Sequence, residues 1–219
     1  MTINIITLFP ETVDNALDYS IIGRAKAKGT VNINAVQLRD YTWHKQKQTD
    51  DYPYGGGGGM VLYAQPLLSA WADIRAKAGF GHIHTILTSP RGHKFTQEDA
   101  KRLAKLERFI IVCGHYEGVD ERFIEACVDE QISIGDFVVT GGEMPAVLIA
   151  DATARLIPGV LASEDSFTHE SHWDGYLEHP HYTRPEVWEG RRVPPVLLSG
   201  NHKAIAKWRS DNSVSVDSV

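Results

Sequence analysis

The stretch Ser133-Ile-Gly-Asp-Phe-Val-Val-Thr-Gly-Gly-Glu143 follows a short apolar run and leads into a long apolar segment. A second stretch, Cys113-Gly-His-Tyr-Glu-Gly-Val-Asp-Glu-Arg122, follows the apolar run 109–113 in the same way. Each places glycine and acidic residues where a buried strand passes into a loop that leads towards a helix. Because glycine lacks a Cβ and tolerates positive φ, the two loops can bring bare backbone groups close to a flat polar ligand. We expect one pocket at these strand ends, although tight turns alone would explain any single glycine.

Length and composition indicate an ordinary globular protein. The chain has 219 residues, of which 42% are hydrophobic and 23% charged, enough for one large domain with a small appendage. Cys113 and Cys127 are far apart and lack metal-ligand spacing, which argues against a disulfide scaffold and a zinc ribbon. The run Ile3–Phe9 is too short for a signal peptide, and no apolar stretch approaches the ~20 residues needed to cross a bilayer. We expect a cytoplasmic protein that does not bind membranes.

Charge is distributed unevenly along the chain. The formal net charge is −6, which by itself disfavours a nucleic-acid partner. Residues 117–170 contain twelve acidic side chains and two arginines, whereas residues 181–209 contain six Lys or Arg and two glutamates. The basic end is therefore a candidate for phosphate contacts, with a solvated charged surface as the alternative.

Hydrophobic periodicity predicts strands that alternate with helices. Strands are expected at residues 3–9, 31–38, 82–89, 109–113 and 131–134. Helices are expected at residues 12–27, 66–77, 96–106, 119–128, 143–157 and 201–209. This alternation predicts an α/β fold, a mainly parallel sheet with helices on both faces. No Gly-x-Gly-x-x-Gly follows any of these strands, which argues against a Rossmann-type nucleotide site.

Three segments lack regular periodicity. Residues 39–60 end in five consecutive glycines and read either as an active-site loop or as a flexible surface loop. Residues 163–181 mix acids, histidines and glycine and are expected to form a mobile interdomain loop. Residues 213–219 are expected to be a frayed tail.

Several motifs together resemble the bacterial tRNA (guanine-37-N1)-methyltransferase family over residues 1 to about 209. They are Cys113–Arg122, Ser133–Ala146, Ile157-Pro-Gly-Val-Leu161, Glu164-Asp-Ser-Phe167 and His181-Tyr-Thr-Arg-Pro185. The resemblance implies a SPOUT-type α/β fold with a C-terminal trefoil knot and a small helical C-terminal extension. It also implies methylation of N1 of guanine 37, the base 3′ of the tRNA anticodon, with S-adenosylmethionine as methyl donor.

The resemblance implies an organisation of the chain as well. Residues 1–162 would form the methyltransferase domain with the S-adenosylmethionine pocket, and residues 163–181 a flexible interdomain loop. Residues 182–219 would form a tRNA-binding region that is shorter than the helical C-terminal domain usual in the family. Members of the family are homodimers with the active site at the subunit interface, so tRNA and a second copy of the chain are the expected partners.

The family's cofactor pocket maps onto the two glycine-bearing loops and the end of the strand 82–89. The residues are Leu87, Thr88, Ser89, Pro90, Gly114, Tyr116, Glu117, Ser133, Ile134, Gly135, Asp136, Phe137, Val138, Val139, Gly141, Gly142 and Pro145. Glu117 would face the cationic methionine end or the substrate, although a solvated carboxylate would look the same in sequence. Phe137 stands where the family often has tyrosine.

Two side chains are the catalytic candidates. The neutral N1 of guanine is a poor nucleophile until its proton is removed, and the resemblance assigns that role of general base to Asp165. The resemblance assigns Arg155 to stabilising negative charge on the base. A turn or cap role for Asp165 and a helical ion pair between Asp151 and Arg155 are the alternatives.

The histidines near the C-terminus give no metal motif. Their spacing, with His169-Glu-Ser-His172 one residue short of His-Glu-x-x-His, predicts no protein-bound metal. Magnesium assists the reaction of the resembling family and can be held largely by water and substrate oxygens. Two other functions stay open: another SPOUT RNA methyltransferase, and a non-catalytic RNA-binding homologue.

Overall fold

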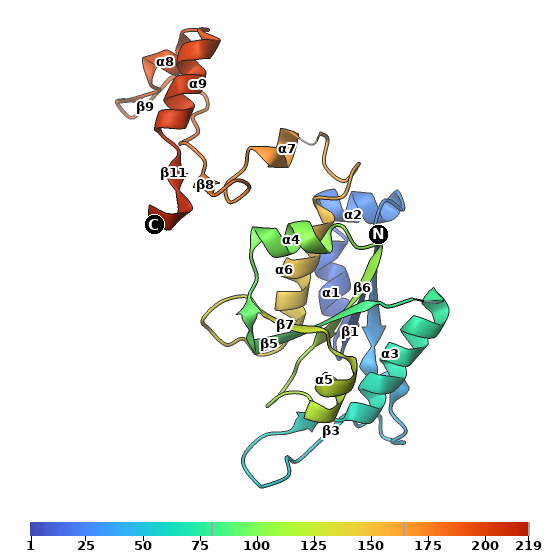
Figure 1. Cartoon of the computed structure of the whole chain (residues 1–219). Helices are drawn as coiled ribbons and strands as arrows, with labels where there is room; N and C mark the ends of the chain where they lie inside the picture. Colours follow the sequence, from blue (N-terminus) through green and yellow to red (C-terminus); the bar gives the residue numbers. More distant parts are fainter. Residues whose placement is uncertain (80, 164, 219) are drawn as a thin grey trace. The chain divides into compact units, whose positions relative to one another are not determined.

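The computed structural model describes residues 1–79, 81–163 and 165–218, without the side chains of Asp165, Ser166 and Asp217. The chain divides into two compact units, Met1–Ala162 and Ser163–Val219 (Figure 1). The first unit contains the main sheet and its covering helices, and the second contains short helices and strands. Each unit is described by itself below.

A five-stranded sheet forms the centre of the first unit. Its strands are β1 (Thr2–Thr7), β2 (Asn32–Gln37), β5 (His84–Lys94), β6 (Arg108–Cys113) and β7 (Glu130–Ser133). They are arranged in the order β2-β1-β6-β5-β7, and every neighbouring pair is parallel. The predicted parallel sheet is confirmed.

Alternation along β6 shows why the sheet needs cover on both sides. Phe109 and Ile111 belong to one buried cluster, and Ile110 and Val112 belong to the other, all with no exposed surface. Since successive side chains of a strand point to opposite faces, a strand apolar at every position is buried on both. Helices must therefore pack on each face of the sheet.

The two faces are covered by different helices (Figure 1). One cluster joins the sheet to α1 (Pro10–Leu17), α2 (Ser20–Ala27), α4 (Gln97–Leu103) and α6 (Glu143–Ala154). The other joins the sheet to α3 (Ala64–Ala78), α5 (Glu121–Cys127) and the 3-10 helix η1 (Leu38–Tyr41). The predicted helices on both faces are confirmed.

Local signals set several helix boundaries. Thr96 and Asp99 form the capping box expected at the start of α4, and Pro10 occupies the first turn of α1. The mainly helical segment predicted over residues 12–27 is confirmed and consists of two helices, since α1 ends at Leu17 and α2 begins at Ser20. Gly23 lies so close to the backbone of Asp18 that a Cβ there would meet its carbonyl group, so this close packing turns the chain.

The glycine-rich segment forms a hairpin beside α5. The short strands β3 (Asp50–Asp51) and β4 (Val61–Leu62) pair antiparallel on either side of it. The amide of Glu117 donates to the carbonyl of Met60 at 3.0 Å, and the amide of Asp120 donates to the carbonyl of Leu62 at 3.0 Å. These bonds join the base of the hairpin to the loop that follows β6.

The second unit contains more regular structure than its sequence suggests. Its elements are α7 (Asp165–Thr168), β8 (Tyr176–Leu177), β9 (Val187–Trp188), β10 (Arg191–Arg192), α8 (Pro195–Leu198), α9 (His202–Asp211), β11 (Val214–Ser215) and η2 (Val216–Ser218). β11 pairs antiparallel with β8, and β10 pairs with β9. The frayed tail expected at residues 213–219 is therefore wrong for β11, whose partner is distant in the sequence. Across the described residues, no helix combines the length and the apolar character needed to span a membrane.

Candidate functional site

The carboxyl ends of β6 and β7 and the middle of β5 converge on one cavity of about 370 Å³. Parallel sheets commonly bind ligands outside the carboxyl ends of their strands, and this volume is typical of small-molecule sites. Most lining residues come from residues 87–91 in the middle of β5, from the loop after β6, and from the loop that joins β7 to α6. The two glycine-bearing loops thus meet in space.

The cavity brings together all predicted cofactor residues except Gly135 and Asp136. Asp136 instead accepts a hydrogen bond from Lys94 at 2.5 Å. At Gly135, where φ is +150°, the ring of Phe137 packs against the backbone so closely that a Cβ would contact it. Gly118, one of the glycines of the two quoted stretches, also lines the cavity, and further lining residues that the sequence did not single out are Arg91, His115, Val119, Glu121, Ile124, Gln131, Ile132 and Thr140. Most of these lie in or next to the two quoted motifs, so their position beside these motifs was the one feature of the sequence that could have identified them.

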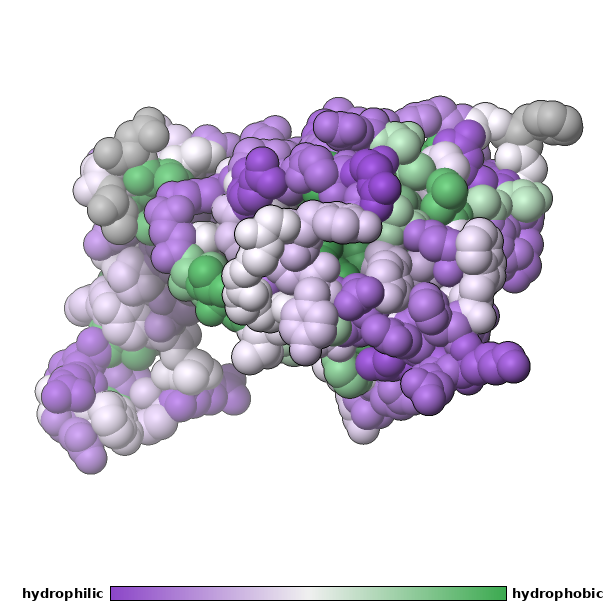
Figure 2. All heavy atoms as spheres, turned by 90° about the horizontal axis from the view of Figure 1, so that it is seen from below, coloured by the Kyte–Doolittle hydropathy of each residue, from purple (hydrophilic) through white to green (hydrophobic). Residues whose placement is uncertain are grey.

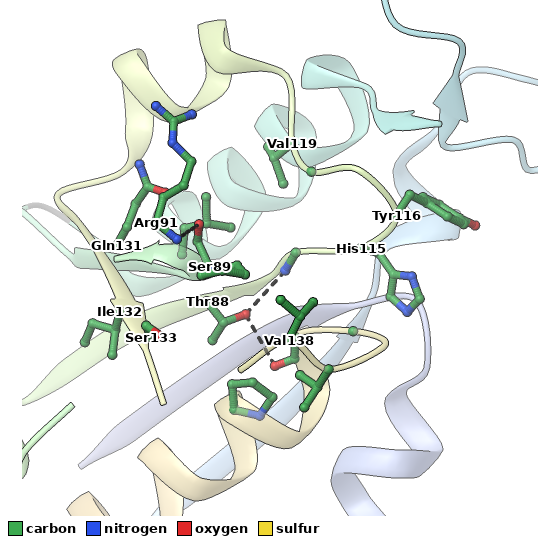
Figure 3. A pocket seen from close by; sticks show the side chains of 18 of the residues that line it. Thr88, Ser89, Arg91, His115, Tyr116, Val119, Gln131, Ile132, Ser133 and Val138 are labelled. Carbon is green, nitrogen blue, oxygen red and sulfur yellow. Dashed lines mark hydrogen bonds between the residues drawn. The ribbon is translucent and has the colours of Figure 1, made fainter. Parts of the chain in front are cut away.

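Thr88 connects the strand ends around the cavity (Figure 3). Its buried hydroxyl lies 3.2 Å from the carbonyl oxygen of Val112 and 3.3 Å from that of Gly142, and accepts from the amide of Gly114 at 3.3 Å. The amide of Gly142 donates to the carbonyl of Gly114 at 2.7 Å. One hydroxyl thus satisfies backbone groups of both glycine-bearing loops and fixes their separation.

Gly142 permits this close approach. A Cβ at Gly142 would meet the Thr88 hydroxyl, would lie 2.6 Å from the amide nitrogen of Gly114, and would lie 2.8 Å from the Cα of Cys113. Two of these three neighbours are backbone atoms that cannot move aside by changing rotamer. The need for glycine here is steric and comes from packing between two loops.

Tyr116 is held in an uncommon backbone conformation on the cavity wall. Its φ is +58°, in the left-handed region that non-glycine residues rarely adopt. Its ring lies edge-on to that of His115, with 5.0 Å between centroids, and Figure 3 shows both side chains on the same loop. Strained residues of this kind concentrate at ligand sites.

A buried carboxylate lies at the end of the loop that joins β7 to α6. Glu143, 6% exposed at the first position of α6, accepts from the hydroxyl of Thr7 at 2.7 Å. Its other oxygen lies 3.6 Å from Nε2 of His115, whose buried Nδ1 has no hydrogen-bond partner within the part of the chain that the structure describes. Burial and then the charge of Glu143 raise the pKa of the Cys113 thiol, which is therefore neutral. Glu143, on α6, thus contacts both β1 and the loop that follows β6.

Charged side chains of both signs line the cavity. Arg91 pairs with Glu121 at 3.3 Å, and Glu117 provides a second carboxylate. The carboxylates can attract a cationic ligand group, and the guanidinium can bind a carboxylate. The site therefore suits a small ligand that carries charges of both signs.

Of the two predicted catalytic residues, Arg155 is not among the described residues that line this cavity. Arg155 is half-buried at the C-cap of α6, where its amide donates to the carbonyl of Asp151 at 3.0 Å. Pro145, at the other end of the same helix, contacts the cavity, so a helical rise of 1.5 Å per residue separates the two by ~15 Å. Asp165 opens α7 in the second unit, and its side chain lies outside the described residues.

The surface of α6 is unusually apolar. Met144 and Leu148, one turn apart, are 51% and 49% exposed, and Val138 in the preceding loop is 79% exposed. Asp151 and Arg155 continue the same side of the helix at helical spacing. In contrast, hydrophilic side chains dominate the face shown in Figure 2, where hydrophobic side chains form only small separate areas. An exposed apolar stripe of this kind marks an interaction surface.

Comparison with known proteins gives consistent matches over nearly the whole chain. Residues 1–217 match the family described as tRNA (Guanine-1)-methyltransferase TrmD. The tRNA (guanine-N(1)-)-methyltransferase of Ruminiclostridium cellulolyticum is 51% identical over 214 residues, which are 98% of this chain and 91% of the relative. The enzyme of the same name from Bacillus subtilis is 50% identical over 214 residues, covering 98% and 88%. The crystal structure of tRNA (m1G37) methyltransferase from Aquifex aeolicus superimposes with a TM-score of 0.79 at 38% identity, covering 95% of this chain and 87% of that one.

Proposed function

The chain belongs to the tRNA (guanine-1)-methyltransferase family, and from this we infer that it methylates N1 of guanine 37 in tRNA. The fold is accordingly of the SPOUT type, and the activity is that of a methyltransferase. The observation that carries the proposal is the match over residues 1–217, together with the cavity at the strand ends. The trefoil knot expected for this fold stays a prediction.

S-adenosylmethionine is the methyl donor that we propose for the cavity. Apolar side chains such as Leu87 and Pro145 can cover an adenine ring, and backbone groups of the glycine-bearing loops can bind its polar edge. The negative carboxylate of Glu117 can attract the cationic end of the donor, and the positive Arg91 guanidinium can bind the carboxylate of its methionine part. When bound, the donor supplies an electrophilic methyl group on a sulfonium centre.

The proposed reaction begins with removal of a proton. The Asp165 carboxylate would accept the N1 proton of guanine, which frees an electron pair on N1 for attack on the methyl carbon. The bond between that carbon and the sulfur would break as the new bond forms, with its electron pair going to the sulfur, and S-adenosylhomocysteine would leave. Negative charge that develops on O6 is stabilised by the Arg155 guanidinium through charge-assisted hydrogen bonds. The remaining contribution of the protein is to align N1 with the methyl group.

Magnesium would fit this site by its donor chemistry. Glu117 is a carboxylate on the cavity wall, and Mg²⁺ is bound by one or two carboxylates together with water and substrate oxygens. Bound magnesium would supply positive charge near the oxygens of the base. We assign no catalytic step to it.

We propose that the active site is completed by a second copy of the chain. Arg155 lies ~15 Å along α6 from the cavity of its own subunit, too far to act on a base bound there. The exposed Met144 and Leu148 lie on the same side of α6 and offer an apolar contact for a symmetric partner. In such a homodimer, the Arg155 and Asp165 of one subunit would act beside the cofactor of the other.

The division of roles along the chain follows from this proposal. Residues 1–162 hold the cofactor pocket, residues 163–181 form the interdomain segment with α7, and residues 182–219 contribute to tRNA binding. Arg191 and Arg192 on β10 are exposed and available to phosphates. Since tRNA is the substrate, we place the enzyme in the cytoplasm.

Primer extension tests the reaction directly. Transcribed tRNA with guanine at position 37 is incubated with the protein and S-adenosylmethionine, and reverse transcription is then expected to stop at that base. A tRNA with adenine at position 37 serves as the control and is expected to give no stop. Absence of a stop on the guanine substrate would overturn the proposal.

Nucleoside mass spectrometry separates the remaining alternatives. Another SPOUT RNA methyltransferase would give a ribose-methylated or differently methylated nucleoside instead of 1-methylguanosine. A non-catalytic RNA-binding homologue would bind tRNA and give no methylated product. The Asp165 carboxylate favours base methylation, because guanine N1 carries a proton that must be removed.

A further inference from the structure

Two histidines and an aspartate meet at the edge of the main sheet, outside the cavity. His82 precedes β5, His84 is its first residue, and Asp129 directly precedes β7. Nε2 of His82 lies 3.2 Å from Oδ1 of Asp129, and Nδ1 of His84 lies 3.8 Å from Oδ2 of Asp129. We propose that these three side chains bind a divalent transition-metal ion of the zinc type.

The donor set and its spacing suit such an ion. Zinc binds histidine nitrogen and carboxylate oxygen at ~2.0–2.2 Å, so two ligand atoms at tetrahedral angles are ~3.3 Å apart. One donor atom from each of His82, His84 and Asp129 lies within 4.8 Å of the other two, which requires only small side-chain rotations. Three protein ligands would leave the fourth position of the ion to water.

Neighbouring groups already orient two of the three ligands. Nε2 of His84 lies 2.5 Å from Oε1 of Glu130, which leaves Nδ1 directed towards Asp129. The amide of Thr85 donates to Oδ2 of Asp129 at 2.7 Å. A carboxylate on the far nitrogen of a histidine is the usual outer partner of a metal-bound imidazole. The preorganised arrangement distinguishes this cluster from accidental surface ion pairs.

A second group nearby serves as an internal comparison. His93, Asp99 and Glu130 also bring their donor atoms together, but the Arg102 guanidinium lies against both carboxylates. It donates to Asp99 at 3.0 Å and to both oxygens of Glu130 at 2.9 Å. A cation of the protein itself thus occupies the place that a metal ion would take, so we confine the proposal to His82, His84 and Asp129.

The proposed ion has a structural role. His84 lies three residues before Leu87, the first residue of β5 that lines the cavity, and a rise of ~3.3 Å per residue places the two ~10 Å apart along the strand. A bound ion would join the start of β5 to the turn that precedes β7, and β5 and β7 are adjacent strands in the sheet. We therefore expect metal binding to stabilise the fold.

The test uses the untagged full-length protein, freed of metal with a chelator. Calorimetric titration with zinc chloride is expected to show one saturable site per chain, and cobalt chloride is expected to give visible absorption bands of a bound ion. The variants His82→Ala and Asp129→Asn are each expected to weaken zinc binding more than tenfold. His93→Ala, which removes a histidine from the second group, is expected to bind zinc like the wild type.

Thermal unfolding provides a second readout. Zinc is expected to raise the Tm of the wild type and of His93→Ala but not that of His82→Ala, because an ion that binds only the folded state stabilises it. The His82 side chain is 64% exposed, so its removal should leave the fold intact, which circular dichroism checks. The proposal is overturned if the wild type shows no saturable binding. It is equally overturned if His82→Ala binds zinc unchanged, since another pair such as His179 and His181 would then hold the ion.

Discussion

At the scale of single residues, the site depends on backbone packing more than on side-chain chemistry. Thr88 and Gly142 hold the two glycine-bearing loops at the separation that creates the cavity. Gly142 contributes by having no side chain, since a Cβ would collide with backbone atoms of Cys113 and Gly114. Substitution there should therefore disturb both stability and cofactor binding.

We predict that Gly142→Ala lowers the free energy of unfolding by about 1–3 kcal/mol, the usual cost of overpacking. It should also weaken binding of S-adenosylhomocysteine, because the loops must separate to admit the methyl group. Urea unfolding and calorimetry measure the two effects. Gly58→Ala is the matched control, since a Cβ there meets nothing within 4 Å and φ is not positive. Wild-type stability in Gly142→Ala would contradict the packing described for this loop.

We predict that Asp165→Asn reduces the rate of methyl transfer by about 10²–10⁴-fold, the usual contribution of a general base. Binding of S-adenosylhomocysteine should be unchanged, because the cavity is built from other residues. Single-turnover kinetics on tRNA measure the rate. Asp174→Asn, an exposed aspartate of the same unit, is the control and should retain the wild-type rate. An unimpaired Asp165→Asn variant would remove this residue from the mechanism.

Sequence alone could identify the residues of the cavity but not their contacts. The motifs around Gly114 and Gly142 name most of its wall, because lining residues are neighbours in two short loops. The link from Glu143 to Thr7 spans 136 positions and has no local pattern. Asp129 is also distant from His82 and His84 in the sequence, and only the pairing of β5 with β7 brings these residues together.

At the scale of elements, α6 connects the cavity with the proposed subunit interface. Its buried side packs on the sheet, whereas Met144 and Leu148 remain exposed on the other side. A helix that is apolar all round is normally buried on all sides. A second copy of the chain would provide the missing cover.

We predict that Met144→Lys combined with Leu148→Lys converts the protein to a monomer and abolishes methyl transfer. Two charges at the centre of an apolar contact would each need to be desolvated in the dimer. Analytical ultracentrifugation measures the assembly state. The control carries Tyr19→Lys and Ile21→Lys, which place the same charges on exposed apolar residues near the start of α2. It should remain a dimer.

Mixing two impaired variants tests whether the subunits share the active site. Asp165→Asn keeps an intact cavity, and Gly142→Ala keeps an intact base. In a mixed dimer, one of the two sites would combine the intact cavity of the Asp165→Asn subunit with the intact Asp165 of the Gly142→Ala subunit. Activity should therefore recover after the two proteins are unfolded and refolded together. If activity stays absent although mixed dimers form, each subunit works alone.

A polar contact holds η1 against α3. The hydroxyl of Tyr41 donates to Oδ2 of Asp73 at 2.6 Å, and Lys77 pairs with the same oxygen. Burial and the Asp73 carboxylate raise the pKa of Tyr41 to about 12. Because this pKa is higher in the folded state, the contact stabilises the fold fully below pH ~10, the ordinary value for tyrosine, and is lost as the pH rises towards 12.

We predict that Tyr41→Phe lowers the free energy of unfolding by about 0.5–1.5 kcal/mol at pH 8, the net worth of one hydrogen bond. The difference between Tyr41→Phe and the wild type should shrink as the pH rises from about 10 to 12, because the wild type then loses the same contact. Urea unfolding at several pH values measures it. Tyr52→Phe, an exposed tyrosine, is the control, and a constant difference would contradict the assignment.

Sequence periodicity could predict the main elements because each of them has a local cause. β6 is apolar throughout, and α4 has its capping box in four consecutive residues. The break between α1 and α2 depends on the approach of Gly23 to Asp18, which periodicity does not reveal. β8 and β11 are too short for any pattern and exist only as a pair.

At the scale of the whole molecule, the acidic net charge is compatible with tRNA binding because basic residues are clustered in one segment of the chain. Basic residues concentrate in residues 181–209, and in β10 the exposed Arg191 lies over the ring of Trp188. Phosphate contacts release counterions from nucleic acid, so their number sets the salt dependence of binding. The segment 181–209 should therefore provide much of the electrostatic affinity.

We predict that Arg191→Ala combined with Arg192→Ala weakens tRNA binding and makes it less sensitive to salt. The slope of the logarithm of affinity against the logarithm of salt concentration should become shallower by up to ~2, since each lost phosphate contact changes it by about 0.9. Filter binding at several salt concentrations measures the slope. The control, Lys28→Ala with Lys105→Ala, removes the same charge from exposed positions of the first unit and should keep the wild-type slope. Equal slopes in both double variants would show that net charge, and not β10, governs tRNA binding.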